Sequence, residues 1–505
     1  MSSILIDGPL TPEQVVEVGR GETVALSDQS LARLASSRSR LEALLGGDEP
    51  IYGVNTGFGA LAGERVSDEY LSELQVNLLR SHAAGVGPVL SDEIVRGAIA
   101  VRISSLSLGY SGIRPEVCER LVQLLDSGWV PVVPRIGSLG ASGDLAPSAH
   151  AFLPLIGEGE VRAPDGQVVD GSELVAALGW DPLDLEAKEG LALINGTHFM
   201  ASVASSVLTR AESLLELADL VAAASVDALR GAKAAFDPRA HALRPHPGQI
   251  ESAAAILAAL EGSDRVHPGD DGSTQDAYSL RCAPQVHGAA RDAVAYFRSV
   301  LERELGSVTD NPLVLEAPDQ VLSAGNFHGQ ALSLAFDTMR LALADVAVIS
   351  ERRTFRLVSP STNRDLPPFL SKDPGPSSGL MIVQYTAAAL VAELRALATP
   401  VSIDSIPTSD NQEDHVSMGM TSGDLALRAV DLMGSVIACE ILCACQAIDS
   451  DAGAPGAAVS AMKEKVRERV EELHEDRPPA PDLRAIEQMI DQDAFAAALA
   501  EVRSR

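Results

Sequence analysis

The stretch Gly-Ser-Leu-Gly-Ala-Ser-Gly-Asp-Leu-Ala-Pro, residues 137–147, holds the residues for a reaction of the chain with itself. Glycine lets the backbone bend where a Cβ would forbid it, and it leaves the Gly143 amide nitrogen unhindered for attack on the Ala141 carbonyl. Loss of one water would close a five-membered ring, and loss of a second from the Ser142 hydroxyl would leave a dehydroalanine inside it. The simpler interpretation is a turn before a helix, with Ser142 or Asp144 as its cap.

These eleven residues resemble the signature of the aromatic amino acid ammonia-lyases. The resemblance implies that Ala141, Ser142 and Gly143 form the prosthetic group 4-methylideneimidazol-5-one without an external cofactor. Ala141 and Gly143 would be cross-linked as a 5-imidazolinone, and Ser142 would become 2,3-didehydroalanine. It also implies a mainly α fold, which is the bundle of long near-parallel helices of the ammonia-lyase and fumarase-like superfamily. The same resemblance implies a homotetramer in which each active site takes residues from three subunits.

A glycine-rich loop with the sequence Tyr-Gly-Val-Asn-Thr-Gly-Phe-Gly occupies residues 52–59. A tyrosine has a reference pKa of about 10, so Tyr52 can act as a general base only if its phenolate is stabilised. Taken alone, the segment fits an ordinary half-buried tyrosine as well. The loop is similar to the one that carries the catalytic tyrosine of the same family, and this implies that Tyr52 removes the substrate β-proton.

Two positions resemble the histidine-specific members of the family. His82 ends a helix predicted over residues 68–82, and Glu413 stands where phenylalanine and tyrosine relatives carry glutamine. An imidazole or a carboxylate can hydrogen-bond to the ring of an imidazole substrate, so the resemblance implies that both residues orient that ring. Without it, His82 would be a helix-end or surface residue. The neighbouring carboxylates and histidine at 413–415 lack the helical spacing of a metal site, and we expect no metal.

Further motifs follow in family order. Asn195 precedes a segment, residues 199–230, that no glycine or proline interrupts; at 1.5 Å per residue it makes a rod of about 50 Å. Asn195 could simply cap that helix, whereas the resemblance implies that it holds the prosthetic group and a substrate group. Phe327 would be assigned to the core, but matches the family aromatic that shields the prosthetic group.

The run Gln-Asp-Ala-Tyr-Ser-Leu-Arg at residues 275–281 contains a candidate carboxylate binder. The guanidinium of Arg281 can make two parallel charged hydrogen bonds to an α-carboxylate, although an arginine in a surface salt bridge is the common alternative. Gln275 and Tyr278 match active-site positions of the family, and Tyr278 is taken as a catalytic residue.

Composition limits the partners. The formal net charge of −31 argues against nucleic acid and anionic membranes. No secretory leader or bilayer-spanning apolar run is evident, so we expect a cytoplasmic protein.

Five of the 39 basic residues are lysine, a pattern that resembles proteins adapted to high salt. The five cysteines lack paired spacing, and we expect Cys439, Cys443 and Cys445 to be buried as apolar residues.

We therefore expect an N-terminal domain, residues 1–190, with the tyrosine loop and the Ala-Ser-Gly loop. Residues 191–505 would form the long-helix bundle and the C-terminal helices. The resemblance implies deamination of L-histidine to trans-urocanate and ammonia, the opening step of histidine degradation. The alternatives are a phenylalanine or tyrosine ammonia-lyase, an aminomutase of the same family, or a helical scaffold without activity.

Overall fold

The computed structural model describes residues 3–45, 54, 56, 67, 70–269 and 275–504. It divides into two compact units, each discontinuous in sequence. Unit 1 comprises residues 1–209, 297–337 and 400–424, and unit 2 comprises residues 210–296, 338–399 and 425–505. The compact units differ from the contiguous division at residue 190 because unit boundaries fall inside four long helices: α9 (His198–Ala228), α13 (Ala283–Leu305), α14 (Gln330–Val358) and α16 (Gly419–Asp449).

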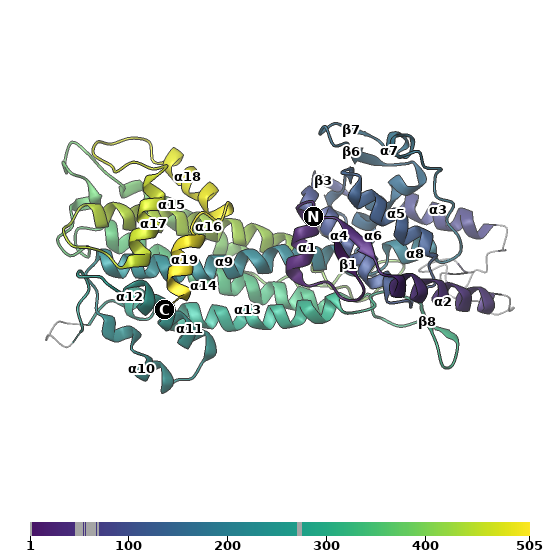
Figure 1. Cartoon of the computed structure of the whole chain (residues 1–505), viewed down its shortest axis with the longest axis horizontal. Helices are drawn as coiled ribbons and strands as arrows, with labels where there is room; N and C mark the ends of the chain where they lie inside the picture. The colour runs from purple at the N-terminus through teal and green to yellow at the C-terminus, as the bar shows by residue number, and fades with distance from the viewer. Residues whose placement is uncertain are drawn as a thin grey trace. The chain divides into compact units, whose positions relative to one another are not determined.

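The fold is mostly helical, as the sequence predicted (Figure 1). Besides parts of the long helices, unit 1 contains helices α1 (Pro12–Gly19), α2 (Asp28–Leu45), α3 (Leu71–His82), α4 (Asp92–Ser107), α5 (Pro115–Asp126), α6 (Leu145–Phe152), α7 (Gly171–Leu178) and α8 (Glu189–Ile194), and the 3-10 helix η3 (Leu153–Ile156). Unit 2 contains η4 (Lys233–Phe236), α10 (Pro238–Ala242), α11 (Pro247–Ala259), α12 (Tyr278–Arg281), η5 (Pro368–Leu370), α15 (Met381–Leu397), α17 (Ala457–Arg467), α18 (Ala480–Asp491) and α19 (Ala496–Arg503).

Short strands occur in unit 1. Strands β1 (Ile4–Ile6) and β2 (Val24–Leu26) pair in parallel, and β3 (Val86–Val89) pairs antiparallel with β5 (Pro134–Ile136). A second group is β4 (Val130–Pro131), β6 (Glu160–Arg162) and β7 (Val168–Asp170), and β8 (Leu313–Leu315) pairs with β9 (Gln320–Leu322). β6 and β7 pair antiparallel and form a hairpin around the turn at residues 164–166.

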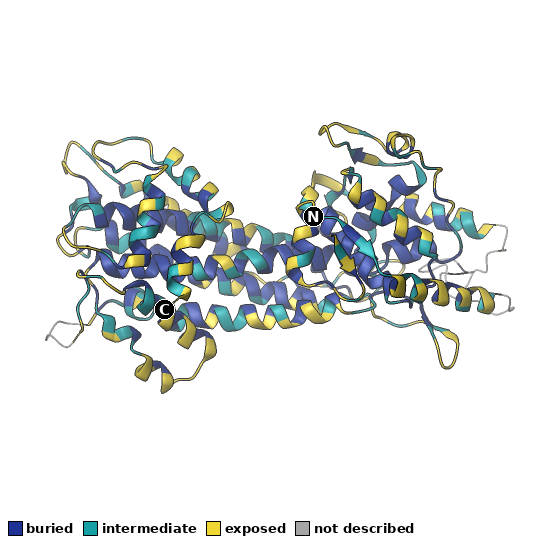
Figure 2. Ribbon diagram, viewed as in Figure 1, coloured by how far each residue is buried: buried dark blue, intermediate teal, exposed yellow. Residues whose placement is uncertain are grey.

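Local sequence explains where helices begin. Thr11 caps α1: its hydroxyl accepts a hydrogen bond from the Gln14 amide at 3.2 Å, and the Gln14 side chain accepts from the Thr11 amide at 3.0 Å. Pro12 occupies the first helical position, where its missing N–H costs nothing. The predicted helix over 199–230 is confirmed as α9. Figure 2 shows most of this helix in dark blue, the colour of buried residues.

A buried ion pair joins three long helices within unit 2. Glu440 of α16 accepts from Arg353 of α14 at 2.6 Å and from the Ser225 hydroxyl of α9 at 2.6 Å. Glu440 and Arg353 are both fully buried, so each charge depends on the other. The polar cluster therefore sets the register of these helices against one another.

The cysteine prediction is confirmed. All five cysteines are free, and Cys439, Cys443 and Cys445 are buried in α16. Burial raises the pKa of Cys439 and of Cys445 to about 12, so neither is a thiolate at neutral pH. Among the described residues, no helix combines the length and the apolar character that a membrane crossing needs.

Candidate functional site

The backbone at residues 140–143 makes a tight, strained turn in unit 1. Gly140, Ser142 and Gly143 have φ angles of +75°, +53° and +85°, and the Gly143 amide donates to the Gly140 carbonyl at 3.3 Å. Ser142 carries a side chain in this left-handed region, a conformation that costs about 1–3 kcal/mol and persists only where surrounding structure enforces it. The loop is thus held in a bend, as the proposed ring closure requires.

The surrounding structure is the turn at Asn195 and Gly196. The Ser142 carbonyl accepts from the Gly196 amide at 3.2 Å and from the Asn195 side-chain amide at 3.1 Å. A Cβ on Gly143 would lie 2.1 Å from the Gly196 carbonyl oxygen, so no other residue fits at position 143. The Asn195 side chain therefore binds the Ala-Ser-Gly loop.

One polar atom of Asn195 is left over. Its Oδ1 is buried and has no hydrogen-bond partner within the described part of the chain. A buried carbonyl oxygen without a partner costs free energy, so such a group indicates an interaction that the encoded residues alone do not supply. The strained turn fits a ring formed from residues 141–143, and the orphaned acceptor fits a ligand that donates an N–H.

Asp144 follows the loop and is fully buried. It occupies the N-cap position of α6, as the simpler interpretation allowed, but its side chain makes no capping hydrogen bond. Its Oδ2 accepts instead from the Met200 amide in α9 at 2.9 Å, while Oδ1 has no partner among the described residues. Burial raises the pKa of this carboxyl to about 8, so it is mostly protonated at neutral pH.

The segment with Glu413 packs against the same loop. The Met418 amide donates to the Leu139 carbonyl at 2.9 Å, and a Cβ on Gly140 would lie 2.0 Å from Ser417 Oγ. The loop and the 413–418 segment, distant in sequence, are therefore adjacent within unit 1.

His82 and Glu413 are close enough to interact electrostatically. His82 Nδ1 donates to the Leu78 carbonyl at 2.9 Å, since a carbonyl only accepts. Burial lowers the pKa of His82, against the raising effects of the Leu78 hydrogen bond and the Glu413 charge, so the ring is neutral with Nε2 as its acceptor. Glu413 Oε2 accepts from Thr408 Oγ1 at 2.7 Å and from Ser409 Oγ at 3.2 Å, which orients the carboxylate.

Phe327 also lies in unit 1, half-buried, shortly before α14. Beside it in sequence, His328 Nε2 donates to the His415 carbonyl at 3.2 Å, and the two imidazole rings stack with centroids 5.9 Å apart. This contact ties the Phe327 segment to the Glu413 segment. The sequence analysis missed the histidine pair and the burial of Asp144; the carboxylate directly after the Ala-Ser-Gly loop was the available signal for the second.

The carboxylate-binding candidates belong to unit 2, whereas the Ala-Ser-Gly loop belongs to unit 1. Gln275 is exposed, and Tyr278 begins α12 with 71% of its surface exposed. Arg281 ends α12, and its guanidinium carbon lies 4.6 Å from the Tyr278 ring centroid. Tyr52 lies outside the described residues. The predicted site residues that the structure describes are thus divided between the two units by membership.

Other site types find little support. Within residues 3–45, 54, 56, 67, 70–269 and 275–504, no group of three histidine, cysteine or acidic residues is placed to hold a metal ion. A cavity of about 600 Å³ in unit 2 is lined by residues of α11 and α19, including Ile250, Leu257 and Leu499. None of the predicted site residues that the structure describes lines it.

Comparison with known proteins identifies the class. The model of the family described as aromatic amino acid lyase matches residues 10–471. The chain belongs to this family. A histidine ammonia-lyase of Gloeobacter violaceus is 47% identical over 492 residues, which cover 96% of this chain and 95% of that protein.

Two solved structures are similar throughout. A tyrosine aminomutase from Streptomyces globisporus matches with a TM-score of 0.94 at 38% identity, covering 99% of this chain and 98% of that chain. A histidine ammonia-lyase from Trypanosoma cruzi matches with a TM-score of 0.92 at 36% identity, covering 99% and 96%. These likenesses confirm the predicted fold class.

Proposed function

We propose that the protein is a histidine ammonia-lyase that converts L-histidine to trans-urocanate and ammonia. The observation that carries the proposal is the similarity over nearly the whole chain to histidine ammonia-lyases, and the electrostatic effect of Glu413 on His82, in the unit that holds the strained Ala-Ser-Gly loop, supports it. A carboxylate accepts a hydrogen bond from an imidazole N–H, whereas a phenyl ring has no hydrogen-bond donor. The pair therefore favours an imidazole over a phenyl ring.

The prosthetic group 4-methylideneimidazol-5-one is part of this proposal, formed from Ala141, Ser142 and Gly143. Its support is the turn at residues 140–143 and the Asn195 side-chain amide, which donates to the Ser142 carbonyl and would hold the group through that oxygen. The unpartnered Oδ1 of Asn195 would accept from an N–H of the substrate. When formed, the group supplies an electrophile that withdraws electron density from the substrate and makes its amine a better leaving group. Phe327 would shield it from water.

The remaining chemistry needs a carboxylate binder and a base. Arg281 would bind the substrate α-carboxylate through two charged hydrogen bonds, with Gln275 and Tyr278 beside it. Tyr52 would take the β-proton as a phenolate. His82 and Glu413 would orient the imidazole, so that the reacting atoms are held in line.

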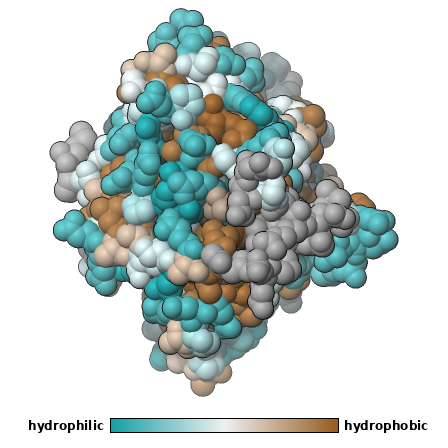
Figure 3. Space-filling view, turned by 90° about the vertical axis from the view of Figure 1, so that its right-hand side faces the viewer, coloured by the Kyte–Doolittle hydropathy of each residue, from teal (hydrophilic) through white to brown (hydrophobic). Residues whose placement is uncertain are grey.

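We also propose a homotetramer in which neighbouring subunits complete each active site. Large apolar side chains are exposed in both units, among them Ile403 at 79% and Leu243 at 88%. Figure 3 shows hydrophobic areas between hydrophilic ones on one face of the molecule. Such surface is costly in water and suits burial against other subunits.

The test is the near-ultraviolet absorbance of urocanate, followed with purified protein and L-histidine at low and high salt. Ser142→Ala removes the hydroxyl that must leave as water, and we expect a folded protein with almost no turnover. Ser172→Ala, at an exposed helix start, is the matched control and should keep full activity. Mass spectrometry should find the wild-type chain lighter than its encoded mass by two waters. The Ser142→Ala chain should not show this loss of two waters.

Other outcomes separate the alternatives. Turnover of phenylalanine or tyrosine instead of histidine would contradict the assignment of His82 and Glu413. β-Tyrosine as the product would favour an aminomutase, the class to which the similar Streptomyces structure belongs. Full activity of Ser142→Ala would refute the prosthetic group. Cytoplasmic location and adaptation to high salt stay predictions, and an unfolding curve unmoved by salt would contradict the second.

A further inference from the structure

Asp276 is a buried residue within the exposed carboxylate-binding segment of unit 2. It is 6% exposed, whereas Gln275 beside it and Tyr278 two positions on are exposed. Its carboxylate accepts from the Ala232 amide at 2.8 Å and forms an ion pair with Arg364. Its main-chain carbonyl accepts from Arg281 Nε at 3.0 Å. Asp276 therefore connects Arg281 to the buried structure below the segment.

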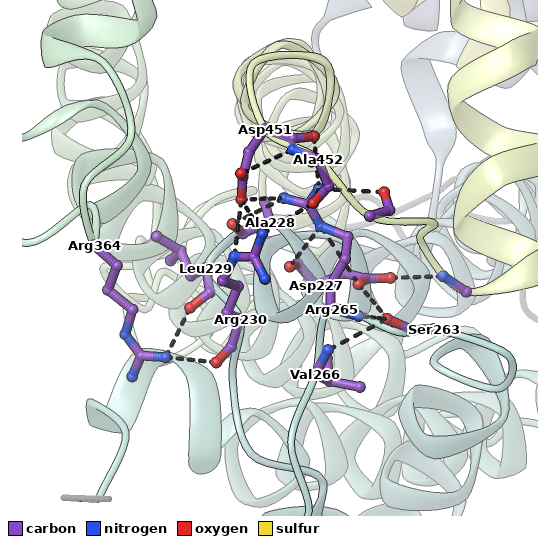
Figure 4. A network of polar contacts seen from close by, with 12 residues as sticks. Asp227, Ala228, Leu229, Arg230, Ser263, Arg265, Val266, Arg364, Asp451 and Ala452 are labelled. Atoms are coloured by element: carbon purple, nitrogen blue, oxygen red, sulfur yellow. Dashed lines mark hydrogen bonds and ion pairs between the residues drawn. The ribbon is translucent and has the colours of Figure 1, made fainter.

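Arg364 anchors Asp276 to the end of α9. Its Nη1 donates to the Leu229 carbonyl at 2.7 Å and to the Arg230 carbonyl at 2.8 Å, both visible as dashed lines in Figure 4. These carbonyls directly follow the last residue of α9, where the helix dipole favours a cation. The other terminal nitrogen, Nη2, binds Asp276. One guanidinium thus bridges a long helix and the carboxylate-binding segment.

This bridge determines which edge of Arg281 is available. A guanidinium can bind a carboxylate in a bidentate manner through its Nη1–Nη2 edge or its Nε–Nη2 edge. The bond to the Asp276 carbonyl occupies Nε, and no hydrogen bond within the described part of the chain engages Nη1 or Nη2 of Arg281. The Tyr278 ring lies against the face of the guanidinium. The Nη1–Nη2 edge is therefore left for the ligand.

A second contact holds the same segment. Arg353, paired with Glu440, donates from Nη1 to the Ser279 carbonyl at 3.4 Å. This contact restrains the middle of α12, but it does not reach Asp276. Since Arg281 Nε is bound only through the Asp276 carbonyl, the direction of the guanidinium depends on where Asp276 is held.

We propose that Asp276 and Arg364 are positioning residues that aim Arg281 at the substrate carboxylate. The inference rests on the proposed function only in that Arg281 binds that carboxylate. Neither positioning residue need touch the substrate. Their removal should weaken the binding of ligands that carry a carboxylate, and it should leave the binding of the imidazole ring unchanged.

The experiment compares Arg364→Gln with Arg230→Gln in the full-length enzyme. Arg230 also lies at the end of α9, where its side chain donates to Asp451 and to the Ala452 carbonyl (Figure 4). Within the described residues, no hydrogen bond joins that side chain to residues 275–281. In Arg364→Gln we expect the KM for L-histidine to rise about tenfold, the effect of losing one charged hydrogen bond, with kcat changed less than twofold. Arg230→Gln should keep both constants. Circular dichroism checks that each variant is folded.

Two inhibitors separate positioning from a general loss of structure. Imidazolepropionate carries the ring and a carboxylate, and histamine carries the ring without one. In Arg364→Gln the inhibition constant of imidazolepropionate should rise in parallel with KM, while that of histamine stays constant. An equal rise for both inhibitors, or an unchanged KM, would overturn the inference.

A second variant covers a failure of Arg364→Gln to fold. Asp276→Asn keeps the acceptor for the Ala232 amide and the main-chain carbonyl but loses the ion pair, and it should show the same split between the two inhibitors. Because every α-amino acid has the carboxylate, wild-type enzyme that acts on phenylalanine or tyrosine permits the same KM comparison with that substrate. That outcome would contradict the proposed function and still test the positioning.

Discussion

The protonation of Asp144 offers a prediction with a worked magnitude. Burial raises the pKa of this carboxyl from 3.8 to about 8. At pH 7 the acid is one pH unit below that pKa, so about ten molecules are protonated for each one ionised. An exposed aspartate would be almost entirely ionised at the same pH. The change to examine is Asp144→Asn, which keeps the shape of the neutral acid and the acceptor for Met200 but cannot ionise.

The raised pKa also has a consequence for stability. Between about pH 4 and pH 8 the folded chain holds one proton at this position that the unfolded chain does not. The contribution of Asp144 to the free energy of unfolding is therefore fully present below about pH 4 and falls by about 1.4 kcal/mol per pH unit up to about pH 8. The asparagine side chain cannot ionise, so this loss is absent in Asp144→Asn. The free energy of unfolding of the variant should therefore rise relative to that of the wild type as the pH increases from about 4 to about 8.

Infrared difference spectroscopy measures the protonation directly. The spectrum of the wild type minus that of Asp144→Asn at pH 6 should contain the carbonyl stretch of a protonated carboxylic acid, and this band should be lost by pH 9. Glu304, whose pKa is also raised by burial, is present in both proteins and cancels. A difference spectrum without the acid band at pH 6 would refute the reasoning.

Two further predictions concern the loop and substrate selection. Gly143→Ala places a Cβ 2.1 Å from the Gly196 carbonyl oxygen, so we expect a lower melting temperature and, by mass spectrometry, a chain that keeps its full encoded mass. Gly8→Ala is the control, because a Cβ there would have no atom within 4 Å. Loss of two waters in the Gly143 variant would contradict the expectation. Glu413→Gln weakens the acceptor for an imidazole N–H, so kcat/KM for L-histidine should fall about tenfold or more relative to that for phenylalanine. The exposed neighbour variant Asp414→Asn should leave this ratio unchanged, and an unchanged ratio in Glu413→Gln would remove its role in specificity.

Local patterns predicted the elements well. The uninterrupted run at residues 199–230 became α9, because helix formation depends on residues three or four apart. The two-unit division was not predictable in this way. It arises because long helices leave one unit, and the chain returns to it much later.

In the candidate site, too, the sequence predicted what depends on a local motif and missed what depends on contacts between distant segments. Motif resemblance picked out Asn195, whose amide does bind the Ser142 carbonyl. The ion pair between Arg364 and Asp276 was not predicted, because it joins residues far apart in the chain and no local pattern marks either partner. Tyr52, outside the described residues, stays a prediction.

By itself, the sequence determined the covalent possibilities of this protein and its local geometry. It contains the Ala-Ser-Gly tripeptide with glycines that permit the bend, and the long helices with their caps, because these depend on bonded neighbours and on residues one turn away. Only the tertiary structure decided that Asp144 is protonated, that His82 lies near Glu413, and that Arg281 presents one edge of its guanidinium. These properties depend on burial and on contacts between distant segments, and both exist only once the chain is folded.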